Sequence, residues 1–152
     1  MGIAYSDQKT KWNQNSPSEM IKTNELGGRV RYAYGSFTAA TQQSDIQMFN
    51  LPNNARIIEG TVSHAALGSS TTISVGHAAY NDSDGTAIVA DVDEFKAAAA
   101  STGVVTVAIA ATVALGRNSI VSADKDGYPV TVSLAGGNGT GLIELAMTYV
   151  VD

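Results

Sequence analysis

Short runs of alternating apolar and polar residues, separated by turn residues, recur through most of the chain. The first is RVRYAYGSF (29–37), and the last is LIELAMTYVV (142–151). The last run places on one face Ile143, Leu145, Met147, Tyr149 and Val151. Glycine accounts for 15 of the 152 residues and falls largely between these runs. About eight short strands with turn signals at this spacing predict an all-β chain, folded as an antiparallel β-sandwich or jelly roll.

One segment, DVDEFKAAAAST (91–102), predicts a short helix instead of a strand. Asp91 is a suitable N-cap, and Glu94 follows three residues later, as in a capping box. Four consecutive alanines favour the helix, and Gly103 is expected to end it. The predicted fold is therefore an antiparallel β-sandwich with one short helix.

The start of the chain shows no sustained period. We interpret residues 1–28 as an extended N-terminal arm and residues 29–152 as the β-sandwich domain, with a floppy terminus as the alternative to a docking arm. Trp12 favours docking, because a lone tryptophan in a polar segment is a good anchor for a groove on a partner.

The charge of the chain is low and uneven. Only 15% of the residues are charged, which suits a protein that packs against others. Residues 1–31 carry five basic and three acidic residues, whereas the remainder carries four basic and eleven acidic residues. An acidic body is repelled by phosphates, so no nucleic-acid partner is expected.

The sequence lacks cysteine, a signal-peptide core and an apolar run long enough to span a membrane. The chain has no cysteine, so it has no disulfide, no thiolate metal site and no cysteine nucleophile. No hydrophobic signal-peptide core follows Met1, which predicts synthesis in the cytoplasm. The apolar run from Gly103 to Leu115 is too short to span a bilayer, so no membrane is expected as a partner.

Both histidines, His64 and His77, fall on the more apolar faces of two consecutive predicted strands. If LGSS (67–70) turns a β-hairpin centred between Gly68 and Ser69, the two rings lie roughly 13 Å apart, too far to share a metal ion. A turn two residues later would bring them face to face. Two histidines alone do not complete a zinc shell. We interpret them as hydrogen-bonded residues at the margin of the core.

The segment YNDSDGTAIVAD (80–91) matches part of a calcium-binding loop. Asp82 and Asp84 fit the third and fifth ligand positions, but Tyr80 at the first cannot supply a carboxylate, and Asp91 stands where glutamate is usual. A helix should precede such a loop, and a strand is expected here. We interpret the segment as a solvated, Asp-rich turn, with calcium binding as the alternative.

No arrangement of residues predicts an enzyme. No serine lies in a GxSxG motif, and neither histidine has a persuasive base–orienter pair. The glycine-rich AGGNGTG (135–141) has no lysine to reach a phosphate, and a strand follows it, so it is expected to turn a β-hairpin. Asp91, Asp93 and Glu94 lie at the predicted helix start, where the helix dipole explains them. We expect no catalytic residue, no metal and no cofactor.

Two segments resemble the head decoration, or capsid cement, proteins of tailed bacteriophages. A polar N-terminal segment ends in GGRVRYAYGSFT (27–38), and FNLPNNARIIEGTVSHAALGSSTTISVGHAAY (49–80) contains the LP-x-x-A-R-I start, the LGSSTTISVG hairpin and the small-residue ending. An Ala-rich stretch and a closing strand ending in Tyr149–Val151 complete a match over residues 27–152. The resemblance implies a β-sandwich without catalytic residues that binds assembled capsids, often as a trimer at three-fold or quasi-three-fold positions.

From this resemblance we expect a virion structural protein on the capsid surface that stabilises the shell. Its expected partners are the major capsid protein and further copies of the chain, as a homotrimer. The residues we expect to contact the capsid or another copy are Trp12, Arg29, Arg31, Tyr32 and Tyr34.

Two alternatives remain open. One is a tail or head-fibre base component of the virion, and the other is a carbohydrate-binding β-sandwich module. The second rests on aromatic residues that could include a stacking platform for sugars, although alternation places several of them on core faces. These residues are Tyr5, Trp12, Tyr32, Tyr34, Tyr80, Tyr128 and Tyr149.

Overall fold

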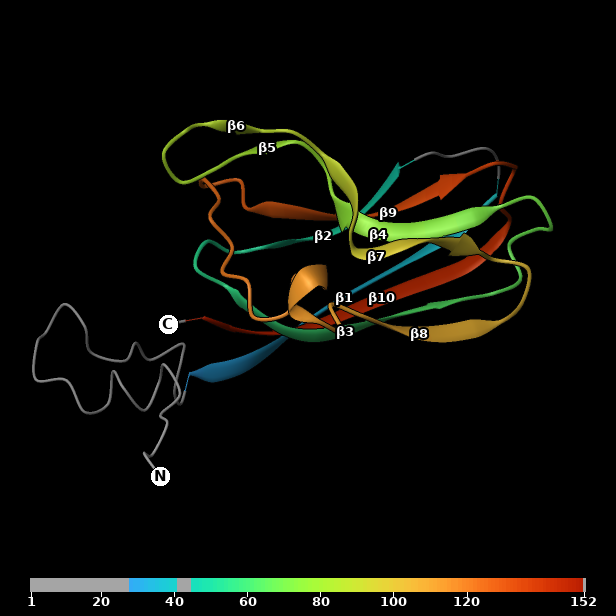
Figure 1. Ribbon diagram of the computed structural model, residues 1–152, viewed down its shortest axis with the longest axis horizontal. Coiled ribbons are helices and arrows are strands. Elements are labelled where there is room, and N and C mark those ends of the chain that lie inside the picture. The colour runs from blue at the N-terminus through green and yellow to red at the C-terminus, as the bar shows by residue number, and fades with distance from the viewer. Residues whose placement is uncertain (1–27, 41–44, 152) are drawn as a thin grey trace, which may run out of the picture.

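The computed structural model describes residues 28–40 and 45–151, which form two four-stranded antiparallel sheets packed face to face (Figure 1). Sheet A contains, in spatial order, β1 (Arg29–Ala39), β10 (Gly141–Val151), β3 (Arg56–His64) and β8 (Val105–Ile109). Sheet B contains β2 (Asp45–Leu51), β9 (Tyr128–Ala135), β4 (Thr72–His77) and β7 (Asp91–Ala100). The described residues also form the hairpin of β5 (Tyr80–Asn81) and β6 (Ala87–Ile88) and the 3-10 helix η1 (Val113–Leu115). No helix in these ranges is long and apolar enough to cross a membrane.

The strands follow the order of a jelly roll. The chain passes from one sheet to the other at every connection between the main strands except the one from β4 to β7, which returns to sheet B after the β5–β6 hairpin. Apart from β4 and β7, the neighbours within each sheet are therefore strands that do not follow each other along the chain, as in two interlocked Greek keys. The predicted antiparallel sandwich is confirmed, and the predicted arm, apart from Gly28, lies outside the described residues.

The two predicted hairpin turns are loops, but neither joins paired strands. LGSS (67–70) leads from β3 in sheet A to β4 in sheet B, and AGGNGTG (135–141) leads from β9 to β10. The loops pack closely against each other, since a Cβ at Gly136 would lie 2.2 Å from Ser70 O. Turn residues indicate that the chain changes direction, and the hydrophobic faces of the following strands decide which sheet they join.

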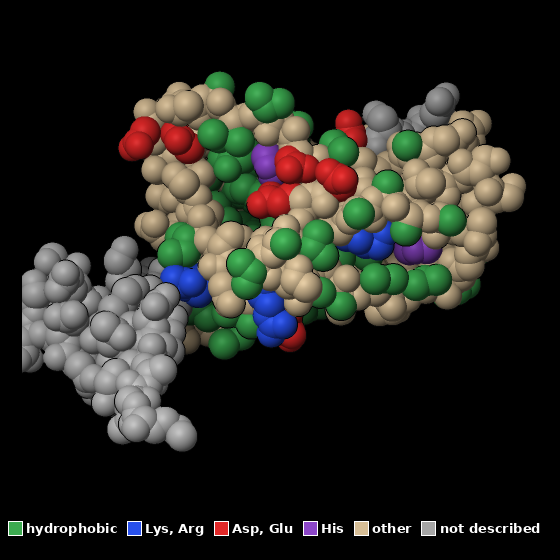
Figure 2. Space-filling view, viewed as in Figure 1, with side chains coloured by type: hydrophobic (Ala, Val, Ile, Leu, Met, Phe, Trp, Pro, Cys, Tyr) green, Lys and Arg blue, Asp and Glu red, His purple; other side chains and the backbone are tan. Residues whose placement is uncertain are grey.

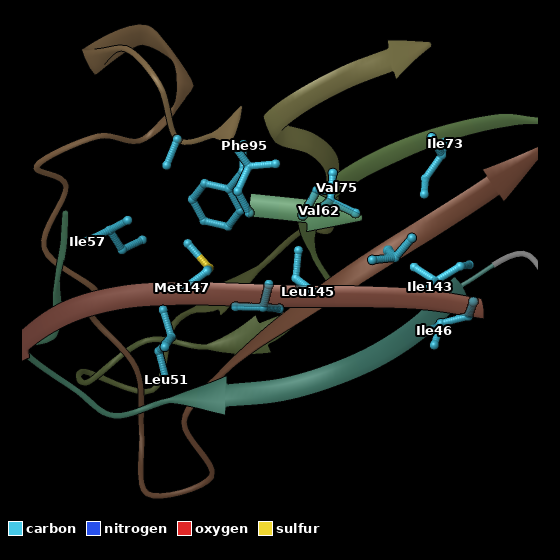
Figure 3. Close-up of a cluster of buried hydrophobic side chains, with 14 of the residues drawn as sticks. Ile46, Leu51, Ile57, Val62, Ile73, Val75, Phe95, Ile143, Leu145 and Met147 are labelled. Carbon is cyan, nitrogen blue, oxygen red and sulfur yellow. The ribbon is translucent and has the colours of Figure 1, made fainter. Parts of the chain in front are cut away.

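Alternating side chains from both sheets fill the core (Figure 3). Ile143, Leu145 and Met147 of β10 are all fully buried, which confirms the predicted inward face of the last strand up to the register shift after Thr148. Beyond the shift Val150 is buried, and Tyr149 and Val151 are only partly buried. Val75 and Phe95 meet them from sheet B and are equally buried. Burial of each aliphatic or aromatic side chain of this size stabilises the fold by about 1.5–3 kcal/mol.

The predicted helix over residues 91–102 is wrong, because this segment forms β7 at the edge of sheet B. The Asp91 carboxylate does not cap a helix and instead accepts the N–H of Asp93, two residues on, at 3.2 Å. Phe95 fills the core, and β4 supplies the backbone partners of the strand. The helical preference of alanine over other residues, at most about 0.7 kcal/mol per residue, is too small to outweigh these tertiary interactions.

Strand β7 pairs irregularly with β4 and passes directly over Gly76. Val75 pairs with Lys96, and His77 pairs with Asp91, so two steps along β4 correspond to five along β7. A Cβ at Gly76 would lie 1.9 Å from Asp91 O. Only glycine leaves room for the two backbones to approach this closely.

Replacing Gly76 with alanine is expected to lower the free energy of unfolding by at least about 2 kcal/mol, because the added methyl group overlaps Asp91 O. Urea unfolding followed by circular dichroism measures this change. Gly103→Ala is the matched control, since a Cβ there meets only Val105 Cγ2, at 4.0 Å. Equal unfolding midpoints for the two variants would show that β7 does not lie against Gly76.

Candidate functional site

Two exposed tyrosines lie on the outer face of sheet A. Tyr32 and Tyr34 alternate with inward-facing residues of β1 and are 66% and 51% exposed. The Tyr34 hydroxyl donates to Glu144 Oε1 at 2.5 Å, and this hydrogen bond raises the pKa of Tyr34. The Tyr32 hydroxyl has no hydrogen-bond partner among the described residues. Val30 and Leu142, also exposed, extend the apolar part of this face.

A hollow of about 390 Å³ opens in the outer face of sheet A where β8 ends. Strand β8 pairs with β3 only from Gly60 to His64, and the chain turns away after Ile109. Ala110 makes this turn at φ +49°, an unfavourable conformation for a residue with a side chain, and its N–H donates to Phe95 O at 3.0 Å. Strand β3 continues past the end of β8. Beyond Gly60, the outward side chains of β3 therefore have no β8 residue beside them, which leaves a hollow in the surface.

Four strands and the segment around η1 line this hollow. The lining residues are Tyr32, Glu59, Gly60, Thr61, Ala108, Ile109, Ala111, Arg117, Ala146 and Thr148. Three of them are alanines, so the surface between the larger side chains is low. Glycine is required at position 60, where a Cβ would lie 2.7 Å from Ala146 O.

The hollow contains two charged groups that do not pair with each other. Glu59 makes no hydrogen bond or ion pair with a described residue. Arg117 makes one hydrogen bond, from Nη1 to Ala111 O at 3.4 Å, which leaves most of its donors available. The hollow therefore presents a carboxylate, a guanidinium and a phenol ring to solvent.

The structure divides the predicted contact residues into two groups. Tyr32 and Tyr34 lie together on the outer face of sheet A. Arg29 and Arg31 are also exposed, but alternation along β1 places them on the opposite face of the strand, at its first residues. Trp12 lies outside the described residues.

The two histidines are buried and lie in different sheets. His64 Nδ1 is 2.8 Å from Ala65 O, and His77 Nδ1 is 2.9 Å from Ala78 O. A carbonyl oxygen only accepts, so each Nδ1 carries the hydrogen. The interpretation of both residues as hydrogen-bonded histidines at the core margin is confirmed. In the described part of the chain, no three His, Asp or Glu side chains are placed to hold a metal ion.

A cluster of polar and aromatic side chains surrounds His77. Glu94 Oε2 accepts the hydroxyl hydrogen of Tyr128 and lies 3.5 Å from His77 Nε2. The rings of His77, Tyr80 and Tyr128 have centroids 4.9–5.2 Å apart. Figure 2 shows acidic side chains gathered near a histidine and beside apolar groups, on the side of the molecule that carries β5 and β6.

This cluster links sheet B to the base of the β5–β6 hairpin. Burial raises the pKa of Tyr128 far above its ordinary value of 10.0, and its hydrogen bond to Glu94 raises it further. Burial also raises the pKa of Tyr80. Sequence reasoning misses the cluster, because it assigns Glu94 to the start of a helix and because Tyr128 is 34 residues away from Glu94.

The loop with Asp82 and Asp84 turns the β5–β6 hairpin. Asp82 Oδ1 accepts the N–H groups of Asp84 and Thr86, each at 2.9 Å. These bonds form the Asp-rich turn that the sequence predicts. The segment that follows is the strand β7 instead of the expected helix.

Comparisons with solved structures find the same fold in chains of phage capsids. No protein-family model and no curated protein matches the sequence. A chain in the capsid asymmetric unit of Cyanophage Pam1 matches with a TM-score of 0.60 and 18% identity, over 92% of this chain and 99% of that chain. A chain in the capsid of Ralstonia phage GP4 matches with a TM-score of 0.60 and 20% identity, over 88% and 91%.

A third similar chain comes from the acidic stable capsid structure of Helicobacter pylori bacteriophage KHP30. It matches with a TM-score of 0.55 and 13% identity, over 80% of this chain and 87% of that chain. All three identities are low, so what these proteins share with this chain is the fold.

Replacing Tyr128 with phenylalanine is expected to make the free energy of unfolding fall less steeply as the pH rises above about 10. The pKa of Tyr128 is raised in the folded state, so its contribution to the free energy of unfolding is fully present below about pH 10. Near that pH the tyrosine of the unfolded chain begins to release its hydroxyl proton. Above that pH each such group lowers the free energy of unfolding by about 1.4 kcal/mol per pH unit. Urea unfolding between about pH 8 and pH 11 compares the slopes. Identical slopes in the two proteins would contradict a buried, protonated Tyr128.

Proposed function

We propose that this protein is a virion structural protein that binds the outer surface of an assembled bacteriophage capsid and stabilises it, as a decoration or cement protein. The observation that supports this most is the extent of the shared fold. The match to the Cyanophage Pam1 capsid chain covers 92% of this chain and 99% of that one, so a single jelly roll accounts for nearly all of both. A weakly charged jelly roll is suited to packing against neighbours on a shell.

Stabilisation requires only that the protein prefers the assembled shell to free subunits. A protein that binds the shell alone shifts the assembly equilibrium by mass action, and each added copy contributes again. A standard interface buries about 1,600 Å² in total, which a domain of this size can provide. No cavity with catalytic groups is needed for this role.

The proposed shell contact consists of the arm and the first residues of β1. Strand β1 begins where β10 ends, at one end of the sandwich (Figure 1), and Arg29 and Arg31 directly follow the arm. These arginines would meet an acidic patch on the major capsid protein, and Trp12 would anchor the arm in a groove. In this arrangement Tyr32 and Tyr34 lie on the other face of β1 from these arginines.

Reversing one charge at the proposed contact is expected to weaken attachment. Arg31→Glu should reduce binding to assembled capsids by about tenfold or more at low salt, because a like charge would face the acidic partner. Co-sedimentation with assembled capsids and with free capsid subunits measures attachment. Lys125→Glu is the matched control, since this side chain is 85% exposed and lies in the loop before β9. Equal loss in both variants would show that net charge, rather than this surface, governs binding.

The proposed homotrimer has a separate test. Light scattering on the purified protein should give about three times the 15.7 kDa mass of one chain, either free or after release from capsids. A protein that stays monomeric and does not sediment with capsids would exclude the decoration role. Association with tails in place of heads would favour a tail or head-fibre base component.

A further inference from the structure

The hollow at the end of β8 combines an aromatic ring with two groups of opposite charge that do not pair with each other or with another charged group of the described residues. We infer that it binds a pyranose ring of a glycan. The inference does not depend on capsid binding, because the hollow belongs to the isolated domain. The groups that carry it are Tyr32, Glu59, Thr148 and Arg117.

The presence of one negative and one positive group in the hollow favours a neutral ligand rich in hydroxyl groups. Glu59 only accepts hydrogen bonds and Arg117 only donates them, and neither has its hydrogen-bonding capacity filled by a described residue. A sugar hydroxyl both donates and accepts, so one ring can satisfy both groups. An anion would be repelled by Glu59, and a cation would be repelled by Arg117.

The residues that line the hollow can contact both the apolar and the polar groups of a sugar ring. Tyr32 is 66% exposed beside the hollow, and its ring offers an apolar face for the C–H groups of a pyranose. Tyr32, Thr148 and Glu59 occupy one row across three strands, so the outer two residues lie about 10 Å apart between Cα atoms. Ala146 and Ala108 line the hollow in the neighbouring row, where their small side chains keep the surface beside the first row low.

The position of the hollow keeps it accessible in the proposed virion. It lies on the outer face of sheet A, whereas Arg29 and Arg31 lie on the opposite face of β1. A glycan site of this open kind binds a single sugar weakly. Many copies on one particle would bind a surface polysaccharide far more tightly through avidity.

Titration with methyl glycosides tests the inference on the full chain. The probes are the methyl pyranosides of glucose, galactose, mannose and N-acetylglucosamine, followed by saturation-transfer and chemical-shift NMR. At least one is expected to bind in the millimolar range, as a small and open site allows. Tyr32→Ala should weaken that binding about tenfold, and Tyr32→Phe should retain it, because the stacking ring remains.

Tyr34→Ala is the matched control. This tyrosine lies on the same face of the same strand and is 51% exposed, but it does not line the hollow. Unchanged binding in Tyr34→Ala together with a loss in Tyr32→Ala assigns the sugar to the hollow. Equal binding in Tyr32→Ala and the unaltered protein would overturn the inference, as would no binding of any probe at about 20 mM.

Removal of each charge separates a sugar from an ion. For a neutral pyranoside, Glu59→Gln and Arg117→Gln should both weaken binding, because each removes a charge-assisted hydrogen bond. Acetate and methylammonium serve as the anionic and cationic probes. The inference is wrong, and the hollow is an ion site, under two conditions together. The neutral pyranosides do not bind, and removing one charge strengthens binding of an ion: Glu59→Gln that of acetate, or Arg117→Gln that of methylammonium.

Discussion

The ladder between β1 and β10 is the constraint on which the rest of sheet A depends. It joins the first and last strands of the described chain through eleven consecutive pairs, from Arg29 with Val151 to Ala39 with Gly141. Strand β10 also carries β3 on its other edge, and β3 in turn carries β8. The sheet is therefore complete only when nearly the whole chain is present. A topology with so many distant pairings is expected to fold slowly, because loop closure must precede the contacts that stabilise it.

The surface features follow from where individual strands end. Strand β8 has only five residues, and its departure at Ala110 leaves the hollow beside Glu59 and Thr148. Strand β1 begins at the end of the sandwich, so its first residues leave both faces exposed, with arginines on one side and tyrosines on the other. One strand thereby supplies two surfaces of different chemistry, which is how a small domain can contact a shell and still present a second face outward.

The sequence identifies the strands well because alternation is local. The segments of β1 and β10, and the first inward residues of β10, follow directly from period two. The separation of Arg31 from Tyr32 across β1 was also predictable from this rule. Strand β7 could not be predicted in this way, because its alanines favour a helix locally. It forms a strand because Gly76 of β4, which is distant in sequence, leaves room for its backbone. The partners of Glu94 and the shape of the hollow depend likewise on contacts that no local pattern encodes.

The β5–β6 hairpin is a position where residues can be inserted without changing the order of the strands. It begins after β4 and returns to β7, its neighbour in the same sheet, so its length does not enter the crossings between the sheets. Its tip, around Gly85, has open space on all sides of the missing Cβ, and Val89 just beyond β6 is 85% exposed. Added residues at this tip would lengthen a solvent loop without altering any strand order, since loop-closure entropy rises only slowly with length. The hairpin is thus a place where a foreign peptide can be carried on the surface of the domain.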